Sequence, residues 1–318
     1  MTAPLQLGRV SSLFPHVKED WWKDAHNEVY LWTDGDCVEN PGLTDTECDH
    51  LVRIPRLQEI LLESTSHTLP KRALDLCCGQ GRHSINLARR YPLVQFYGFD
   101  QSAYLVNLAR ERAIAGKVDT NTTFEVGDAR KIPLSEHFDI VLLMGNSFGY
   151  CSIEDNEGIL HEVSRVLKPG GIFVVDYVDG AWMRTNFTPA GWEWLDSAHV
   201  PPSMDHKKLV ALREREISPD NKRLASREIV IDLGGPTIHQ DLFYSIQLYS
   251  LEEMESLLAT AGLSILPQDC TVITGPKGEG VTDLGMMEQR QLVVAQKIQA
   301  LGTDSVEPQE ADIYTHPN

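Results

Sequence analysis

The sequence predicts an α/β protein built on a doubly wound, mostly parallel sheet, with an N-terminal helical extension and an antiparallel β insertion. Between residues 72 and 176, short apolar segments alternate with helix-length segments, as in parallel sheets whose strands are joined by helices. Residues 179–250 instead carry strand-like alternation with turn signals. Residues 21–61 contain apolar side chains at helical spacing before the first strand.

The parallel sheet is predicted from short apolar segments at residues 72–76, 96–100, 123–126, 138–143 and 172–176. Helices are predicted between them, ending at residue 90, covering residues 102–115, and covering residues 155–167 before a turn at residues 168–171. Because right-handed crossovers join parallel strands, the ends of these strands should lie at one edge of the sheet.

The regions before and after the predicted parallel sheet also carry signals of secondary structure. Thr44 and Glu47 have the spacing of a capping box, which predicts that a helix through residues 51–61 begins there. Residues 209–212, 226–231 and 240–248 are predicted strands of an insertion that covers the sheet edge, followed by a helix at residues 251–261 and a last strand at residues 292–295. We expect the domain division 1–65 for the extension and cap helices, 66–180 for the core, 181–250 for the β insertion or lid, 251–299 for the rest of the core, and 300–318 for a disordered tail.

The chain is strongly acidic, with a formal net charge of −18 and a pI near 5.0. Such a surface repels phosphate-rich partners unless a local basic stripe is present, and the basic stretch at residues 71–72 is short. We therefore expect a small-molecule partner, and neither nucleic acid nor a membrane. The β insertion could serve as the interface of a homodimer.

The cysteine pattern and the N-terminus predict the compartment. Six cysteines lack the paired spacing of a metal site, so no metal is expected. Without a disulfide framework, a reducing compartment is favoured. Residues 1–15 lack the features of a transit or signal peptide, and no apolar run approaches the length of a membrane span. These observations predict a cytoplasmic protein.

A glycine-rich turn joins the first predicted strand to its helix. The segment runs from Asp75 through Gly79 to Gly81 and reads DLCCGQG. Glycines there let the backbone turn tightly and approach a ligand closely. On its own, the turn could bind NAD, FAD or another nucleotide, or no ligand at all.

Two aspartates end the next two predicted strands. Asp100 could accept hydrogen bonds from both hydroxyls of an adenosine ribose, and either it or Ser102 could also cap the following helix. Asp128 could accept from the exocyclic amine of adenine, while the N–H of Ala129 meets a ring nitrogen. Chance seldom places ligand-facing groups at the ends of three successive strands.

These motifs resemble those of the class I methyltransferases, which use S-adenosylmethionine and have a Rossmann-like fold. Residues 75–81 match the family's first motif, except that Cys77 replaces its first glycine, and the DLCCGQGRH variant is similar to a subgroup that methylates small molecules. Asp100 and Asp128 match its ribose and adenine carboxylates. The segments at residues 144–150, 167–171 and 247–262 are also similar to family segments. The resemblance covers residues 72–297 and leaves the first seventy residues unexplained.

The resemblance implies S-adenosylmethionine as cofactor, S-adenosylhomocysteine as product, and residues 66–180 as the cofactor-binding core. The expected contacts with the cofactor are Asp75, Gly79, Gly81, Asp100, Gln101, Asp128, Ala129 and Met144. Among these, Asp75 and the carbonyl group of Met144 would hold the methionine ammonium. Its carboxylate needs donors, and Tyr30 and Arg82 are the candidates.

Methyl transfer from a sulfonium is an in-line displacement onto an N, O or S nucleophile, so alignment and exclusion of water matter more than a catalytic triad. Where the nucleophile carries a proton, a general base helps, and His239 and Tyr150 are the candidate catalytic residues. The candidate acceptor contacts are Trp22, Asn146, Tyr177, Asp179, Arg184, Trp192 and Tyr244. For each of these aromatic residues, a packing role is the alternative.

Other functions remain open on the sequence. A methyltransferase-like enzyme could use the cofactor for a different reaction or act on a protein side chain. A non-catalytic protein could keep only the cofactor site, although Gly79, Gly81, Asp100 and Asp128 are intact. A NAD-dependent oxidoreductase would not need Asp128. The identity of the acceptor cannot be derived from the fold class alone.

Overall fold

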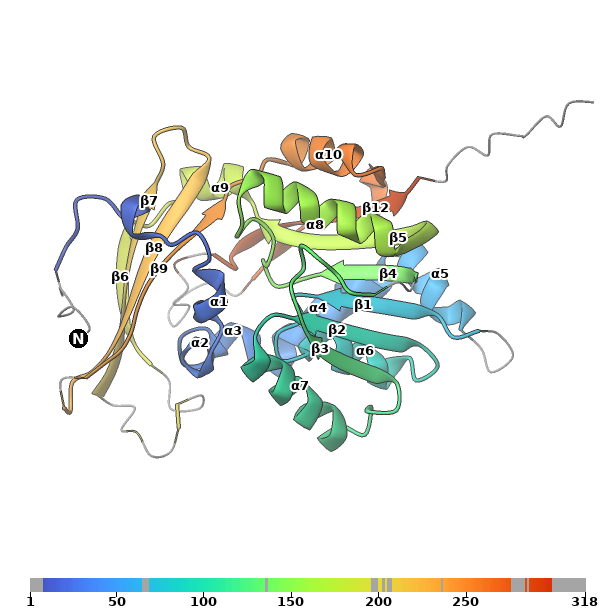
Figure 1. Cartoon of the computed structure of the whole chain (residues 1–318), viewed down its shortest axis with the longest axis horizontal. Coiled ribbons are helices and arrows are strands. Elements are labelled where there is room, and N and C mark those ends of the chain that lie inside the picture. Colours follow the sequence, from blue (N-terminus) through green and yellow to red (C-terminus); the bar gives the residue numbers. More distant parts are fainter. Residues whose placement is uncertain are drawn as a thin grey trace, which may run out of the picture.

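The computed structural model describes residues 8–64, 69–134, 137–195, 200–201, 204, 208–235, 237–275, 284 and 286–298. These residues form a large mixed sheet with helices on both faces and a second, antiparallel sheet (Figure 1). The predicted fold class is confirmed. The tail at residues 300–318 lies outside the described residues. Within the described ranges, no helix has the length and apolar character needed to cross a membrane.

The larger sheet has the strand order β10-β12-β5-β4-β1-β2-β3, and β11 also pairs with β12. The strands are β1 Arg72–Leu76, β2 Gln95–Asp100, β3 Thr122–Val126, β4 Phe138–Leu143, β5 Leu167–Val178, β10 Leu263–Ile265, β11 Thr271–Thr274 and β12 Gln289–Lys297. β1 to β5 are parallel, and β12 runs antiparallel to β5. The strand order reverses between β1 and β4, and sheets of this kind bind ligands at the carboxyl ends beside such a reversal.

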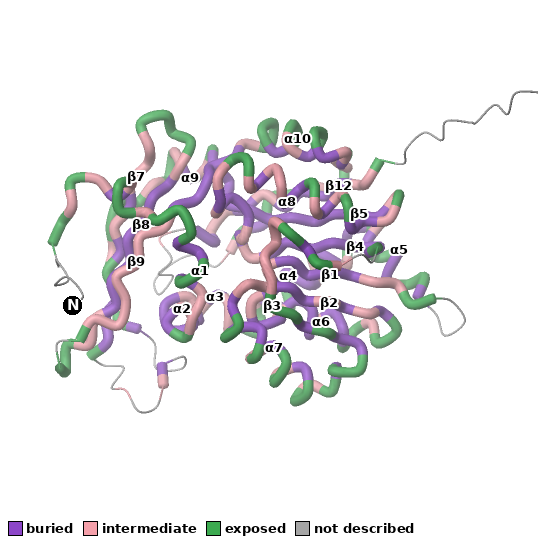
Figure 2. The backbone as a smooth tube through the Cα atoms, viewed as in Figure 1, coloured by how far each residue is buried: buried purple, intermediate pink, exposed green. Residues whose placement is uncertain are grey.

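Two layers of helices cover the larger sheet. They are α4 Pro41–Arg53, α5 Pro55–Glu63, α6 Arg82–Arg90, α7 Ala103–Ala115, α8 Ile153–Val166 and α10 Leu251–Thr260. Successive side chains of a strand point to opposite faces, so Leu74 and Leu76 pack with α8 and α10, whereas Ala73 packs with α4 to α7. Figure 2 shows the buried strands between these layers.

The second sheet has the order β6-β7-β8-β9 and is antiparallel throughout. Its strands are β6 Ala190–Trp194, β7 Leu209–Ile217, β8 Arg223–Asp232 and β9 Thr237–Gln247. Gln247 donates its backbone N–H to the carbonyl oxygen of Gly149, in the loop after β4, at 2.8 Å. This contact ties the second sheet to the carboxyl edge of the larger one.

Short N-terminal elements lie between the two sheets (Figure 1). They are the 3₁₀ helix η1 Phe14–His16 and the helices α1 Trp22–Ala25, α2 Glu28–Thr33 and α3 Gly35–Val38. On one side, Ser102 at the start of α7 donates its hydroxyl to the carbonyl oxygen of His26 at 2.5 Å. On the other side, Val29 and Trp32 pack in one apolar cluster with Val230 of β8. The N-terminal extension therefore bridges the two sheets.

The predicted capping box at Thr44 and Glu47 is wrong. Helix α4 begins earlier, at Pro41, and the side chain of Asn40 accepts from the N–H of Leu43 at 3.1 Å. Asparagine at the N-cap and proline in the first turn both favour this start. Glu47 consequently lies inside the helix, where its carboxylate is buried.

The predicted turn at residues 168–171 lies inside β5, which extends from Leu167 to Val178 and therefore begins before the turn and not after it. The pairing with β4 is irregular there: Phe138 pairs with Leu167 and Ile140 with Ile172. In the region expected to contain only strands, Asp179 caps a helix, α9 Gly180–Thr185. The remaining 3₁₀ helix, η3 Pro267–Asp269, and the short strands β6, β10 and β11 were not predicted, because each has too few residues for a clear period.

Candidate active site

Two cavities lie at the carboxyl edge of the larger sheet. The elbow cavity contains about 790 Å³ of empty space and is lined by Trp22, His26, Tyr30, Cys77, Gly79, Phe99, Asp100, Gln101, Leu105, Gly127, Asp128, Ala129, Arg130, Gly145, Ser147, Tyr150, Cys151, Asn156 and Ile159. The lid cavity contains about 750 Å³ and is lined by Trp21, Ala25, His26, Tyr30, Thr33, Asp34, Cys37, Val38, Gly145, Asn146, Tyr150, Glu228, Gln240, Leu242, Tyr244, Ile246, Met286 and Met287.

The turn after β1 forms the floor of the elbow cavity. Gly79 and Gly81 have φ angles of 53° and 75°, which glycine adopts without the steric cost that other residues meet. Asp100 at the end of β2 holds this turn. One carboxylate oxygen accepts from the N–H of Gly79 at 2.9 Å, and the other accepts from the N–H of Ser102 at 2.8 Å. The predicted glycine turn and the first predicted carboxylate therefore face each other.

Asp128, after β3, lines the same cavity as Asp100. Its carboxylate pairs with the guanidinium of Arg130, with the shortest contact at 2.6 Å. The hydrogen bond from Arg130 is the main reason that the pKa of Asp128 lies below its usual value. The guanidinium also lies 4.7 Å from the centre of the Trp22 ring, so Arg130 connects the end of β3 to helix α1.

Gly127→Ala is expected to destabilise the protein by about 1–3 kcal/mol, the usual cost of overpacking a core. A Cβ atom at this position would lie 1.9 Å from the ring of Phe99, which is buried and lines the elbow cavity. Urea unfolding measures the change. Gly158→Ala is the matched control, because nothing lies within 4 Å of its added Cβ and alanine favours the interior of α8. Equal stability of the two variants would contradict the prediction.

Other residues expected to contact the cofactor lie beneath this surface. Asp75 is buried and accepts from the hydroxyl of Ser84 at 2.7 Å, and burial raises the pKa of its carboxyl group. The carbonyl oxygen of Met144 accepts from the hydroxyl of Ser147 at 3.0 Å. Gly81 is the N-cap of α6. None of Asp75, Gly81 and Met144 lines either cavity.

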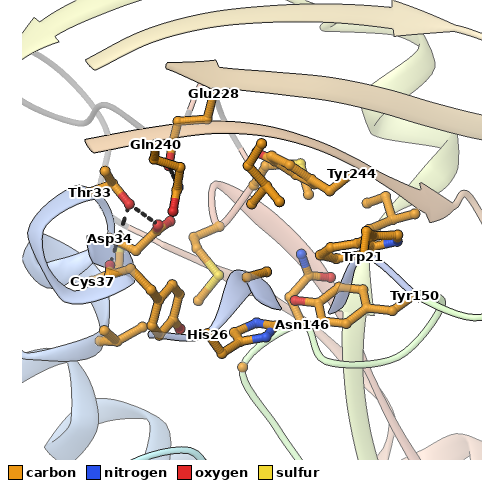
Figure 3. A pocket seen from close by; sticks show the side chains of 18 residues that line it. Trp21, His26, Thr33, Asp34, Cys37, Asn146, Tyr150, Glu228, Gln240 and Tyr244 are labelled. Carbon is orange, nitrogen blue, oxygen red and sulfur yellow. Dashed lines mark hydrogen bonds between the residues drawn. The ribbon is translucent and has the colours of Figure 1, made fainter. Parts of the chain in front are cut away.

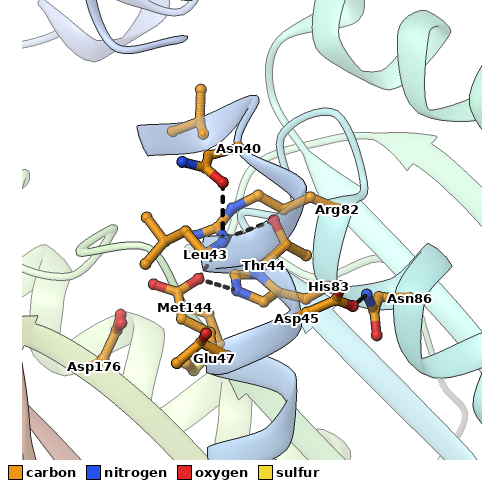
Figure 4. A network of polar contacts seen from close by, with 12 residues as sticks. Asn40, Leu43, Thr44, Asp45, Glu47, Arg82, His83, Asn86, Met144 and Asp176 are labelled. Carbon is orange, nitrogen blue, oxygen red and sulfur yellow. Dashed lines mark hydrogen bonds and ion pairs between the residues drawn. The ribbon is translucent and has the colours of Figure 1, made fainter. Parts of the chain in front are cut away.

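Arg82 belongs to a buried polar network that joins α4, α6, β5 and β12 (Figure 4). Glu47 of α4 pairs with Arg82 and accepts from Nη2 of Arg290 at 2.5 Å. Arg290 also pairs with Asp176, and Asp176 in turn accepts from the N–H of Asn146 at 2.8 Å. The network therefore ends at the loop after β4 that lines both cavities.

Two buried donors in this network make no hydrogen bond to any residue that the structure describes, Nη2 of Arg82 and Nε of Arg290. Nη2 of Arg82 lies 3.6 Å from the position that a Cβ atom would take on Gly145. Gly145 lines the elbow cavity. The unused N–H is therefore close to the point where an anionic group of a ligand would need a donor.

Aromatic side chains and two carboxylates surround the lid cavity (Figure 3). The Trp21 ring lies 5.0 Å from that of Tyr150 and 5.4 Å from that of Tyr244. The carboxylates of Asp34 and Glu228 come from the N-terminal segment and from β8. The N-terminal helices, the loop after β4 and the second sheet thus each supply part of the wall.

His26, Tyr30, Gly145 and Tyr150 line both cavities. Nδ1 of His26 lies 3.3 Å from the carbonyl oxygen of Trp22. Because a carbonyl oxygen only accepts, this contact assigns the proton to Nδ1 and leaves the lone pair on Nε2. Burial raises the pKa values of Tyr30 and Tyr150, so both phenols stay protonated. These four shared residues form the junction of the two cavities. The junction therefore offers one base and two hydroxyl donors.

The structure brings some of the predicted acceptor residues to these cavities. Trp22 lines the elbow cavity, Asn146 and Tyr244 line the lid cavity, and Tyr150 lines both. Gln101 and Tyr30, which were assigned to the cofactor, also reach the elbow cavity. Gln101 is held there by a hydrogen bond from its amide to the carbonyl oxygen of Trp22.

The other predicted residues line neither cavity. Tyr177 is 1% exposed in the core of the larger sheet, and Asp179 caps α9. Arg184 donates to two backbone carbonyl groups, whereas Trp192 is 64% exposed on β6. His239 is the unpaired residue at a bulge of β9, and its ring lies 5.6 Å from that of Trp32. The structure thus places His239, the predicted base, away from both cavities.

Sequence reasoning missed His26, Asp34, Glu228 and Gln240 as cavity residues. His26 and Asp34 belong to the first seventy residues, which the resemblance left unexplained, and that gap was the available signal. Glu228 and Gln240 lie on paired strands, and the amide of Gln240 donates to Glu228 at 2.9 Å. The alternation of side chains along a strand cannot by itself decide whether Glu228 and Gln240 face a ligand.

Comparisons with known proteins agree with this geometry. Residues 73–171 match a family model described as a methyltransferase domain. The chain is also similar in structure to an S-adenosylmethionine-dependent methyltransferase from Clostridium acetobutylicum, with a TM-score of 0.57 and 16% identity. That match covers 80% of this chain and 98% of the other. At this identity, the likeness concerns the fold.

Two relatives illustrate the similarity in sequence. The demethylmenaquinone methyltransferase of Deinococcus radiodurans is 36% identical over 114 residues, which are 36% of this chain and 45% of that protein. The fatty-acid O-methyltransferase of Mycolicibacterium smegmatis is 31% identical over 173 residues, which are 54% of this chain and 57% of that protein. The chain spans about half the length of the curated relatives that it matches.

Proposed function

We propose that this chain, whose residues 73–171 belong to the methyltransferase domain family, transfers a methyl group from S-adenosylmethionine to a small molecule in the lid cavity. The observation that carries the proposal is that the two cavities meet at four shared residues, His26, Tyr30, Gly145 and Tyr150. A cofactor in one cavity and an acceptor in the other would therefore meet at this junction.

The residues of the elbow cavity fit an adenosyl ligand. Asp100 would bind the ribose hydroxyls, and Asp128 with the N–H of Ala129 would bind the adenine, with Gln101 beside them. The unpartnered Nη2 of Arg82 and the hydroxyl of Tyr30 would serve the methionine carboxylate.

Two further groups would serve the methionine ammonium from beneath the cavity surface. They are the carboxylate of Asp75 and the carbonyl oxygen of Met144, directly or through water. Gly79 and Gly81 supply the close backbone approach at the turn. These assignments leave the side chains that line only the lid cavity for the acceptor.

S-adenosylmethionine supplies a methyl carbon that its sulfonium charge already activates. The chain's own residues then need to align the acceptor and exclude water. We assign the first task to the junction residues and the second to the lid, residues 181–250. His26 Nε2 can accept a proton there, whereas the phenol of Tyr150 stays protonated at neutral pH and cannot act as the base. His26 therefore replaces His239 as the proposed base.

The lid cavity has walls from three separate parts of the chain, which supports a small-molecule acceptor over a protein side chain, because a polypeptide would need a groove open at both ends. The presence of this second cavity supports methyl transfer over cofactor binding alone, because a protein that only binds the cofactor has no need of it. Within this proposal, residues 1–65 complete the acceptor site, and residues 66–180 with 251–299 hold the cofactor.

Calorimetry and a labelling assay test the proposal. We expect S-adenosylhomocysteine to bind, since Asp100 and Asp128 match both ends of its adenosyl group. We expect NAD not to bind, because Asp75 and the carbonyl oxygen of Met144, which we assign to the methionine ammonium, would repel its pyrophosphate. With S-adenosylmethionine labelled in its methyl group, cell extract should acquire label in low-molecular-mass compounds. Heat-denatured protein serves as the control. Binding of NAD without the sulfur nucleosides, or label found only in protein, would overturn the proposal.

A further inference from the structure

We infer that the lid cavity accepts a small molecule that carries an aliphatic amine close to a hydrogen-bond-accepting oxygen, so that the methylated atom is nitrogen. This inference rests on the proposed function and adds the chemical class of the acceptor. Four features of the lid cavity carry it: its two carboxylates, one buried amide, its aromatic walls and the imidazole at the junction.

The charged side chains of the wall are acidic. Asp34 and Glu228 both line the lid cavity, and no lysine or arginine is among the described residues that do so. Each carboxylate is positioned by a neighbour: the hydroxyl of Thr33 donates to Asp34 at 2.8 Å, and the amide of Gln240 donates to Glu228 at 2.9 Å. Such carboxylates attract an ammonium group and repel a carboxylate.

Arg213 lies behind this wall. It is 5% exposed, pairs with Glu228 at 2.7 Å and with Glu193, and donates to the carbonyl oxygen of Thr33 at 3.0 Å. Its guanidinium therefore holds Glu228 and the end of α2 together, and it is not among the residues that line the cavity. The positive charge of Arg213 thus lies behind the wall, and Asp34 and Glu228 are the charged residues that line the cavity.

Asn146 supplies a donor for an oxygen atom of the acceptor. Its side chain is buried, and its carbonyl oxygen accepts from the N–H of Val178 at 2.7 Å. Because the partner is an N–H donor, this contact fixes the orientation of the amide. The NH₂ group makes no hydrogen bond with the described residues, although Asn146 lines the cavity (Figure 3). This NH₂ group is therefore able to donate a hydrogen bond to a ligand oxygen in the cavity.

Aromatic faces complete the enclosure. Trp21, Tyr150 and Tyr244 form a continuous wall, with Trp21 in contact with both tyrosines, and the His26 ring stacks against Tyr150 at 5.9 Å. Aromatic faces attract a cation that lies over them. A protonated amine can therefore enter between the carboxylates and the aromatic wall, while a neutral alcohol would gain only the burial of its apolar part.

The reaction on an amine balances with the groups present. The bound ammonium first gives one proton to Nε2 of His26 at the junction. The neutral nitrogen then uses its lone pair to form the new N–C bond, and the electron pair of the broken S–C bond stays on the sulfur. The product leaves as the methylated ammonium ion. No oxidant or other co-reactant is required.

Binding of three matched probes tests the inference. Phenethylamine, 2-phenylethanol and 3-phenylpropionate share a ring and a short chain, and they differ in the charge of the end group. Ligand-observed NMR titrations would use the full chain saturated with S-adenosylhomocysteine at neutral pH. We expect the amine to bind about tenfold more tightly than the alcohol, and the carboxylate to bind most weakly.

Variants then assign the preference to the cavity. Asp34→Asn and Glu228→Gln should each lower the affinity for the amine several-fold and leave that for the alcohol within about twofold. Asp24→Asn is the matched control, because this α1 carboxylate is 78% exposed and lines neither cavity. A titration with S-adenosylhomocysteine verifies that each variant keeps its elbow cavity.

The outcomes separate the two proposals. If the alcohol or the carboxylate binds as tightly as the amine, if none of the probes binds, or if both variants keep full amine affinity, the inference is wrong. The proposed methyl transfer could still hold in those cases. If S-adenosylhomocysteine does not bind the unaltered chain, the proposed function fails. A preference for the amine probe, measured in the absence of S-adenosylhomocysteine, would in that case still support the inference about the lid cavity.

Discussion

Asp100→Ala is expected to lower the affinity for S-adenosylhomocysteine by roughly 100-fold, because leaving a buried donor unpaired costs about 1–3 kcal/mol. The aspartate has two tasks. Its carboxylate would bind the ribose hydroxyls, and it also holds the glycine turn through the N–H of Gly79 at 2.9 Å. Alanine removes both the ligand contact and the support of the turn, so its effect should exceed that of losing one hydrogen bond. Titration calorimetry measures it.

Two controls isolate this effect. Asp119→Ala changes an exposed aspartate between α7 and β3, and it should leave the affinity unchanged. Asp100→Asn keeps an acceptor for the N–H of Gly79 but loses the charge, so its affinity should lie between those of the wild type and Asp100→Ala. Wild-type affinity in Asp100→Ala would show that the carboxylate does not bind the cofactor.

Glu47→Gln is expected to destabilise the fold by about 3–5 kcal/mol, the range for removing one partner from a buried ion pair. Glu47 is 2% exposed and pairs with Arg82 of α6 and Arg290 of β12. The neutral amide would leave both guanidinium groups without their shared carboxylate, and Arg290 would keep only Asp176. Urea unfolding measures the loss.

The same substitution should change how stability depends on pH. Burial by itself would raise the pKa of Glu47, but Arg82, His83 and Arg290 lower it well below its ordinary value of 4.5. A carboxyl group whose pKa is lower in the folded state stabilises the protein at pH values above its unfolded pKa. That stabilisation is lost as the pH falls from about 4.5 toward the lower folded pKa. Glu47→Gln should therefore flatten the loss of stability on the acid side.

Glu59→Gln is the matched control for both measurements. Glu59 makes an ion pair with Arg56 on the surface of α5, where its side chain is 56% exposed. Surface pairs of this kind contribute about 0–1 kcal/mol. If Glu47→Gln proves as mild as Glu59→Gln, the buried network does not hold α4 against the larger sheet.

The sequence predicted the larger sheet well because its signals are local. The segment of β4 is apolar except for Asp139 and is buried along its whole length, as expected for a strand covered on both faces, and its bounds were predicted correctly. The glycine turn, Asp100 and Asp128 each end a strand. Parallel strands joined by right-handed crossovers bring such ends to one edge. The elbow cavity could therefore be anticipated from spacing alone.

The lid cavity could not be anticipated in this way. Asp34 and Glu228 are far apart in the chain, and they meet because α2 packs against the face of the second sheet. His239 had the chemistry expected of a base, yet a bulge in β9 directs it to Trp32. His26, in a segment without a recognised motif, lies at the junction instead. Which side chains share a cavity depends on strand register and helix packing, because these set distances that sequence separation does not.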